Sequence, residues 1–245
     1  MSGHSHAKTI AHDKNIADQK RGAAFSKMVR LITVAIKEGG PNAETNARLR
    51  MALDMAKGIN MPKDNIERAI SRASGADEGQ VFTDFLFEAY GAGNTALLVE
   101  GITDNKNRAF NDVKTIINQN GGKLVGEGAI RWMFERKGLV TIKLDDQLPE
   151  MKNKEALEME TIEAGADDIY WYENILEVHT SPENTEAVKK ALETKGVKVE
   201  SFSLAWLPKE EIEGDEKTKE QVGRLMDALD DNDSVQEVYS NLRDY

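Results

Sequence analysis

The chain has 245 residues, more than one domain of ordinary size needs, and 40% of them are hydrophobic, which is enough for packed cores. It has no cysteine, which excludes disulfides and thiolate ligands and fits a reducing compartment. No apolar run is long enough to cross a bilayer and no secretory leader is recognisable, so we expect a cytoplasmic protein without a membrane partner.

Charge is divided unevenly along the chain. Residues 1–75 contain 13 Lys and Arg against 7 Asp and Glu, a net charge of +6. Residues 76–245 contain the other 19 Lys and Arg against 36 Asp and Glu, a net charge of −17. A basic segment that coincides with one domain indicates a polyanion-binding face. The alternative interpretation is that each half simply presents a solvated surface.

The first 75 residues predict a small three-helix domain. Apolar residues recur at helical spacing at about 15–37 and 44–57, and a third helix opens at Pro62 and stops before Gly75. In the first helix the cations share one arc of a helical wheel, opposite a buried stripe that includes Phe25, and are expected at the surface. The cations on this arc are Lys20, Lys27, Arg30 and Lys37.

A mixed α/β pattern follows. Two strands joined by a glycine turn are expected between residues 82 and 102, then a helix capped by Asp104 and a strand near Ala129–Phe134. A second unit, at 138–208, has the β-α-β-β-α-β order of a ferredoxin-like fold. The C-terminal segment supplies one more helix and one more strand.

The first of these α/β units lacks a second helix and a final strand, so we expect the C-terminal segment to return and complete it. The predicted fold class is therefore α+β, with a basic three-helix N-terminal domain (1–78) followed by two α/β sandwich domains. The middle domain is discontinuous, at 79–137 plus 209–245, and the ferredoxin-like domain, at 138–208, is inserted into it.

No catalytic or cofactor-binding constellation is evident. The glycine pairs near 91–93 and 126–128 do not extend to a dinucleotide or P-loop motif, and hairpin turns explain them better. A metal role is one hypothesis for His4, His6 and His12, but we favour a basic arm in which these histidines are incidental. We expect no enzymatic activity, no catalytic residue, no cofactor, no metal and no small-molecule substrate.

The cations of the N-terminal domain favour nucleic acid. Three helices deliver them, as contacts with several phosphates require. Phe25 is the single aromatic residue before residue 76 and belongs to the buried stripe, so we expect backbone contacts with a duplex or folded RNA rather than base stacking. The candidate nucleic-acid-binding residues are Lys14, Lys20, Arg21, Lys27, Arg30, Arg48, Arg50, Lys63, Arg68 and Arg72.

Several motifs point to a known family. The most specific is Asn-Met-Pro-Lys-Asp-Asn-Ile-Glu-Arg-Ala-Ile at 60–70, and others are Lys-Arg-Gly at 20–22, Phe-Glu-Ala-Tyr-Gly at 87–91, Thr-Asp-Asn-Lys-Asn-Arg at 103–108 and Phe-Glu-Arg-Lys-Gly at 134–138. With these motifs the chain resembles the YebC-type proteins, the group that includes the mitochondrial translational activator of cytochrome c oxidase. The resemblance implies a three-helix domain and two α/β domains, without enzymatic activity or a cofactor.

The resemblance implies one of two functions. The first is a DNA-binding transcriptional regulator; the alternative is a ribosome-associated translation factor that relieves stalled elongation on proline-rich sequences. The expected partner is therefore DNA or ribosomal RNA, and a protein partner recognised by the acidic domains 2 and 3 is a further hypothesis. The N-terminal arm departs from the family pattern, because His6-Ala7 stands where relatives usually carry Lys-Trp.

Overall fold

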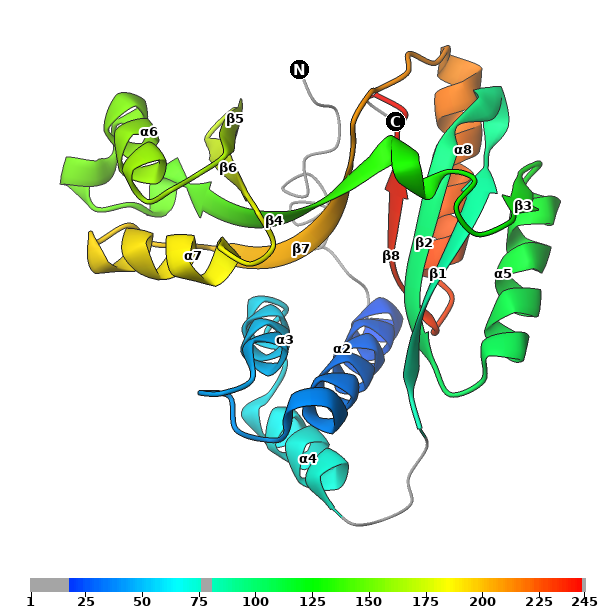
Figure 1. Cartoon of the computed structure of the whole chain (residues 1–245), viewed down its shortest axis with the longest axis horizontal. Coiled ribbons are helices and arrows are strands. Elements are labelled where there is room, and N and C mark those ends of the chain that lie inside the picture. The colour runs from blue at the N-terminus through cyan, green and yellow to red at the C-terminus, as the bar shows by residue number, and fades with distance from the viewer. Residues whose placement is uncertain (1–17, 76–80, 244–245) are drawn as a thin grey trace.

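The structure is a computed structural model that describes residues 18–75 and 81–243 (Figure 1). Within these residues, three helices precede two four-stranded antiparallel sheets. Each sheet packs one face against two helices. None of the helices in the described part of the chain is long and apolar enough to span a membrane.

The N-terminal helices form domain 1 around an apolar core of their own. They are α2 (Asp18–Gly39), α3 (Ala47–Gly58) and α4 (Lys63–Ser74). Ile32, Leu49 and Ala52 are fully buried in this core, at positions where the helical spacing predicts apolar residues. Asn46 fixes the start of α3: its side chain accepts a hydrogen bond from the N–H of Leu49 at 3.0 Å and donates one to the carbonyl of Ala35.

Domain 2 is a sheet that the C-terminal segment completes. Its elements are β1 (Thr83–Tyr90), β2 (Ala96–Thr103), α5 (Lys106–Gln119), β3 (Lys123–Val125), α8 (Glu216–Asp230) and β8 (Val235–Ser240). The strand order is β3-β1-β2-β8, so the last strand of the chain pairs with β2. Helices α5 and α8 cover one face, where Val99, Val113 and Val222 are fully buried.

Domain 3 has the ferredoxin-like arrangement. Its elements are β4 (Phe134–Lys143), α6 (Lys154–Glu163), β5 (Asp168–Tyr172), β6 (Ile175–Thr180), α7 (Thr185–Thr194) and β7 (Ser201–Pro208). The strand order is β5-β6-β4-β7, and α6 and α7 lie on one face. Val140, Val178 and Leu192 are buried between the helices and the sheet.

Domains 2 and 3 are joined through a partly buried contact as well as through the chain. Arg136 of β4 forms two hydrogen bonds with the carboxylate of Glu100 in β2, at 2.9 and 3.0 Å. The hydroxyl of Tyr239 donates to the same carboxylate at 3.0 Å. Burial, reinforced by the charge of Glu100, raises the pKa of Tyr239 well above its usual value. This contact fixes the two sheets relative to each other.

The predicted α+β architecture is confirmed, with three N-terminal helices and a ferredoxin-like domain inserted into the middle one. One predicted strand, Ala129–Phe134, is wrong: a short 3-10 turn at Arg131–Met133 takes its place, and the continuous strand β4 follows it. The reason is Glu88, whose buried carboxylate accepts hydrogen bonds from the N–H groups of Ile130 and Arg131 and so removes them from any strand ladder. Similarly, Asn105 and not Asp104 caps α5.

Candidate nucleic-acid interface

Helix α2 carries the predicted basic arc, and the structure buries part of it. Lys27 is only 8% exposed, and its ammonium group donates hydrogen bonds to the carboxylate and the carbonyl of Asp230, at 2.6 and 2.7 Å. Arg30 lies 3.9 Å from the carboxylate of Asp233. Asp230 ends α8 and Asp233 follows it, so this side of α2 faces domain 2 rather than solvent.

The prediction that Lys27 and Arg30 lie at the surface is therefore wrong for this arrangement of domains. Both lie on the side of α2 away from the core of domain 1, as the wheel indicates, but helical periodicity does not tell whether solvent or another domain covers that side. Of the other candidates at this end of the chain, Lys20 lies within α2 and Arg21 is exposed near its start. Lys14 lies outside the described residues.

The two arginines of α3 also contact other domains. Arg48 lies between Glu38 of α2 and Asp84 of β1, with hydrogen bonds of 2.6 and 2.8 Å. Arg50 donates to the carboxylate of Glu186 in α7 at 2.5 Å. The hydrogen bond to Glu186 raises the pKa of the Arg50 guanidinium against the opposing effect of burial. One arginine thus faces domain 2 and the other faces domain 3.

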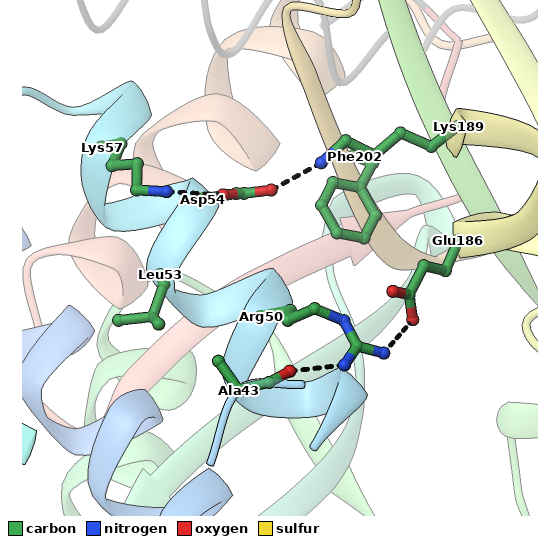
Figure 2. Close-up of a pocket in the computed structure, with 8 residues that line it drawn as sticks. All are labelled: Ala43, Arg50, Leu53, Asp54, Lys57, Glu186, Lys189 and Phe202. Carbon is green, nitrogen blue, oxygen red and sulfur yellow. Dashed lines mark hydrogen bonds and ion pairs between the residues drawn. The ribbon is translucent and has the colours of Figure 1, made fainter. Parts of the chain in front are cut away.

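A cavity of about 230 Å³ lies between α3 and domain 3 (Figure 2). Asp54 lies at one side of it and accepts hydrogen bonds from Lys189 of α7 at 2.6 Å and from Lys57 at 3.1 Å. Burial acts to raise the pKa of Asp54, but the hydrogen bonds and charges of the two lysines outweigh it and hold the pKa below its usual value. The cavity is lined by Ala43, Arg50, Leu53, Asp54, Lys57, Glu186, Lys189 and Phe202.

Each charged side chain that lines this cavity has a partner of opposite sign. The cavity therefore offers no uncompensated charge to a small ligand, and we interpret it as a gap between imperfectly packed domains.

Helix α4 presents its cations to solvent. The side chain of Lys63 is 86% exposed and lies 3.4 Å from Glu67, one turn along the same helix. Arg68 is exposed and donates a hydrogen bond of 2.5 Å to Asn65, again within the helix. Arg72 is exposed one turn after Arg68, and no ion pair of Arg72 is found in the part of the chain that the structure describes. The structure thus separates the candidate cations into a covered group and an exposed group.

The sequence did not identify the carboxylates that cover the first group. Their one signal is the net charge of −17 in residues 76–245, which shows that acid is abundant but not which groups face domain 1. The run Asp-Asp-Asn-Asp at 230–233 is a local enrichment of acid, but in an acidic sequence such a run usually indicates only a solvated turn. The carboxylates are Asp84, Glu186, Asp230 and Asp233.

No group of three or more His, Asp and Glu side chains could hold a metal ion in residues 18–75 and 81–243. His179 is buried in β6 and its ring nitrogen lies 2.7 Å from the carboxylate of Glu177. His4, His6 and His12, on which the metal hypothesis depends, lie outside the described residues.

Family models match almost the whole chain. The model of the TACO1/YebC protein N-terminal domain matches residues 5–76, and that of the TACO1/YebC second and third domain matches residues 82–242. The chain belongs to the TACO1/YebC family. The predicted resemblance is therefore confirmed, and the division between the two models falls where α4 gives way to the first sheet.

Relatives within the family match over their full length. A protein of Elusimicrobium minutum is 44% identical, with 98% of this chain and 95% of the relative covered. A protein of Bacillus subtilis is 42% identical, with 99% and 100% covered. Both are named "Probable transcriptional regulatory protein". The crystal structure of a conserved hypothetical protein from Aquifex aeolicus is 38% identical, has a TM-score of 0.84 and covers 92% of this chain and 91% of its own.

Proposed function

We propose that this protein is a non-enzymatic regulator of gene expression that binds DNA through domain 1. The observation that carries the proposal is the exposure of the cations on α4, Lys63, Arg68 and Arg72, in the segment of the chain that has a net charge of +6. The names of the relatives support a regulatory role for this chain.

The chemistry of α4 suits phosphate contacts. Arg68 and Arg72 are four residues apart and so lie about 6 Å apart along the helix axis, on one side of it. A guanidinium group can form two parallel hydrogen bonds with a phosphate, and its charge is permanent. Phe25, the single aromatic residue of residues 1–75, packs against the core of domain 1, so backbone contacts with weak sequence preference are expected.

A triple substitution tests the proposal. Lys63→Ala, Arg68→Ala and Arg72→Ala together remove up to three phosphate contacts, each of which contributes about 0.9 to the slope of log affinity against log salt on duplex DNA. We expect the slope to fall by up to about 2.7 while the circular dichroism spectrum stays unchanged, because the three positions are exposed.

The matched control is the triple Lys106→Ala, Lys190→Ala and Lys217→Ala, which removes three exposed cations from domains 2 and 3. The net charge changes equally in both variants, so a general loss of positive charge predicts equal losses of affinity. If both variants bind a DNA duplex like wild type, the assignment to α4 is wrong.

The same surface would fit the backbone of a folded ribosomal RNA, so the target needs its own experiment. Sedimentation of the whole chain through a sucrose gradient with ribosomes separates the two partners. Co-migration with ribosomes that is lost on adding salt, together with weak binding to free DNA, would contradict the DNA proposal. This result would favour ribosome association and the role in relieving stalled elongation.

A protein adaptor is the competing function, and one observation favours it. Met159 and Ile162 lie one turn apart on α6 and are 63% and 62% exposed. An adaptor of this kind loses its activity when Met159 and Ile162 are replaced by Ser, and keeps it when the cations of α4 are removed. The DNA proposal predicts that activity is kept when Met159 and Ile162 are replaced and is lost when the cations of α4 are removed.

A further inference from the structure

Four cations of domain 1 contact carboxylates of the other two domains. On α2, Lys27 and Arg30 face the end of α8, and on α3 Arg48 and Arg50 face β1 and α7. These four residues were predicted from the sequence to bind nucleic acid. Each of the four has a carboxylate among its partners, and carboxylate oxygens are the chemical counterpart of phosphate oxygens. The interface therefore places an anion at each of four predicted phosphate-binding positions.

The ion pairs between domain 1 and the other domains are accessible to solvent. Three of the carboxylates, on Asp84, Glu186 and Asp230, keep 46%, 41% and 69% of their side-chain surface exposed, so water and salt reach these ion pairs. A recess of about 230 Å³ lies beside α3 at this contact (Figure 2). Met51 of α3 also packs against the core of domain 3, so the contact is partly apolar. Contacts of this mixed kind between domains permit relative motion.

The contact also leaves donors unused. The Nη1 group of Arg30 and the Nε group of Arg50 are buried and have no hydrogen-bond acceptor among the described residues. A phosphate, which offers several oxygens, would supply acceptors for such groups. The join between domains 2 and 3 differs: there Arg136 forms two hydrogen bonds with Glu100, and the chain itself runs from one sheet to the other.

We propose that domains 2 and 3 hold domain 1 in a closed form in which their carboxylates compete with nucleic acid for Lys27, Arg48 and Arg50. The proposal rests on the proposed function, since it assumes that domain 1 binds a polyanion. Nucleic acid first contacts the exposed cations of α4. Opening of the domains then makes the cations of α2 and α3 available, and the partner that opens them is a polyanion with several phosphates in reach, such as a duplex.

The closed form lowers the apparent affinity in proportion to its population. If about nine molecules in ten are closed, the apparent affinity is about tenfold weaker than that of the open form. A variant that cannot close should therefore bind about tenfold more tightly, and its salt slope should rise by up to about 2.7, because three more cations reach phosphates.

The experiment neutralises the acids and leaves every cation in place. The test variant of the whole chain combines Asp84→Asn, Glu186→Gln and Asp230→Asn. The control variant, Asp112→Asn, Glu127→Gln and Glu155→Gln, removes three exposed charges for which no ion pair is found among the described residues. Binding to a random-sequence DNA duplex is measured by fluorescence anisotropy, and small-angle X-ray scattering gives the radius of gyration of each free protein.

The test variant is expected to bind about tenfold more tightly than the control variant and to have a larger radius of gyration. Equal affinities of the two variants overturn the closed form, because the gain then comes from net charge alone. The α4 assignment is judged separately: if the test variant gains affinity while the α4 triple binds like wild type, the closed form stands and α4 is not the first contact. If no variant binds DNA, both proposals fall.

Discussion

The cations of α4 and those of α2 and α3 come from one small domain, yet their surroundings differ. On α4 the partners of Lys63 and Arg68 lie within the helix, and the side chains remain exposed. On α2 and α3 the carboxylates paired with Lys27 and Arg50 belong to other domains, and Lys27 is buried. Helix position alone does not separate the two groups, because both lie outside the core of domain 1.

The comparison shows that cations of one small domain have two different kinds of surroundings. An exposed cation adds little to stability and is available to a polyanion. A cation with a partner in another domain links those domains, and is available only once they separate.

The largest effect on stability is expected from a substitution in the core of domain 1, which supports both groups of cations. Leu49, the residue between Arg48 and Arg50 in the sequence, is fully buried in the core of domain 1. Leu49→Ala should therefore lower the free energy of unfolding of domain 1 by about 2–5 kcal/mol. All three tryptophans lie beyond residue 130, so the loss should appear in urea titrations as an early transition in circular dichroism without a change in tryptophan fluorescence.

Arg72→Ala is the control for Leu49→Ala, and it should change the free energy of unfolding by about 0.5 kcal/mol or less, because the side chain is exposed. A Leu49→Ala variant as stable as this control would contradict the packing of α3 described above.

A smaller effect on stability distinguishes the covered cations from the exposed cations directly. Lys27→Ala removes two hydrogen bonds of a buried ammonium group to Asp230 and should destabilise the protein by about 1–2 kcal/mol in thermal unfolding. Arg72→Ala again serves as the exposed counterpart. Lys27→Met keeps most of the apolar stem of the side chain. It should therefore recover the part of the lost stability that comes from packing, but not the part that comes from the ion pair. Equal stabilities of the Lys27→Ala and Arg72→Ala variants would remove the distinction between the groups.

The sequence predicts most of the fold for reasons that lie in local pattern. Apolar spacing places Ile32 and Leu49 in the core of domain 1, and the missing strand of the first sheet indicates the return of the C-terminal segment as β8. The pattern fails at Ala129–Phe134, where the distant carboxylate of Glu88 binds the backbone N–H groups that a strand would need. A contact between residues 42 or 43 positions apart in the sequence leaves no mark on local periodicity.

The candidate site shows the same limit. Composition places the cations in domain 1, and the helical wheel places Lys27 opposite the core, but its partner Asp230 lies 203 positions further along the chain. Charge patterning indicates that acid is abundant there, while the pairing depends on how three domains pack. For α4 no such partner intervenes among the described residues, so exposure follows from the helix alone.

The smallest effect is a pH dependence at the contact between domains 1 and 3. Asp54 has a pKa held below its usual value by Lys189 and Lys57, against the opposing effect of burial. An acid whose pKa is lower in the folded state than in the unfolded state stabilises the fold at any pH above its unfolded value, which is about 3.9 for Asp. That stabilisation is lost as the pH falls through the lower folded value. The stability that Asp54 contributes to this contact should therefore be constant between about pH 5 and pH 8 and should decrease below about pH 4.

The measurement is a set of thermal unfolding curves across this range for wild type and Asp54→Asn. The gap in melting temperature should be constant above about pH 5 and should narrow below about pH 4, as the wild-type carboxylate becomes neutral. In the Lys189→Met background the same substitution should have a smaller effect at every pH, because one of the two partners of Asp54 is gone. A gap that widens with acid, or one that is the same in both backgrounds, would show that Asp54 does not link domains 1 and 3. With a side chain 33% exposed, the ion pair is screened by solvent, and the shift in melting temperature is expected to be the smallest of those predicted here.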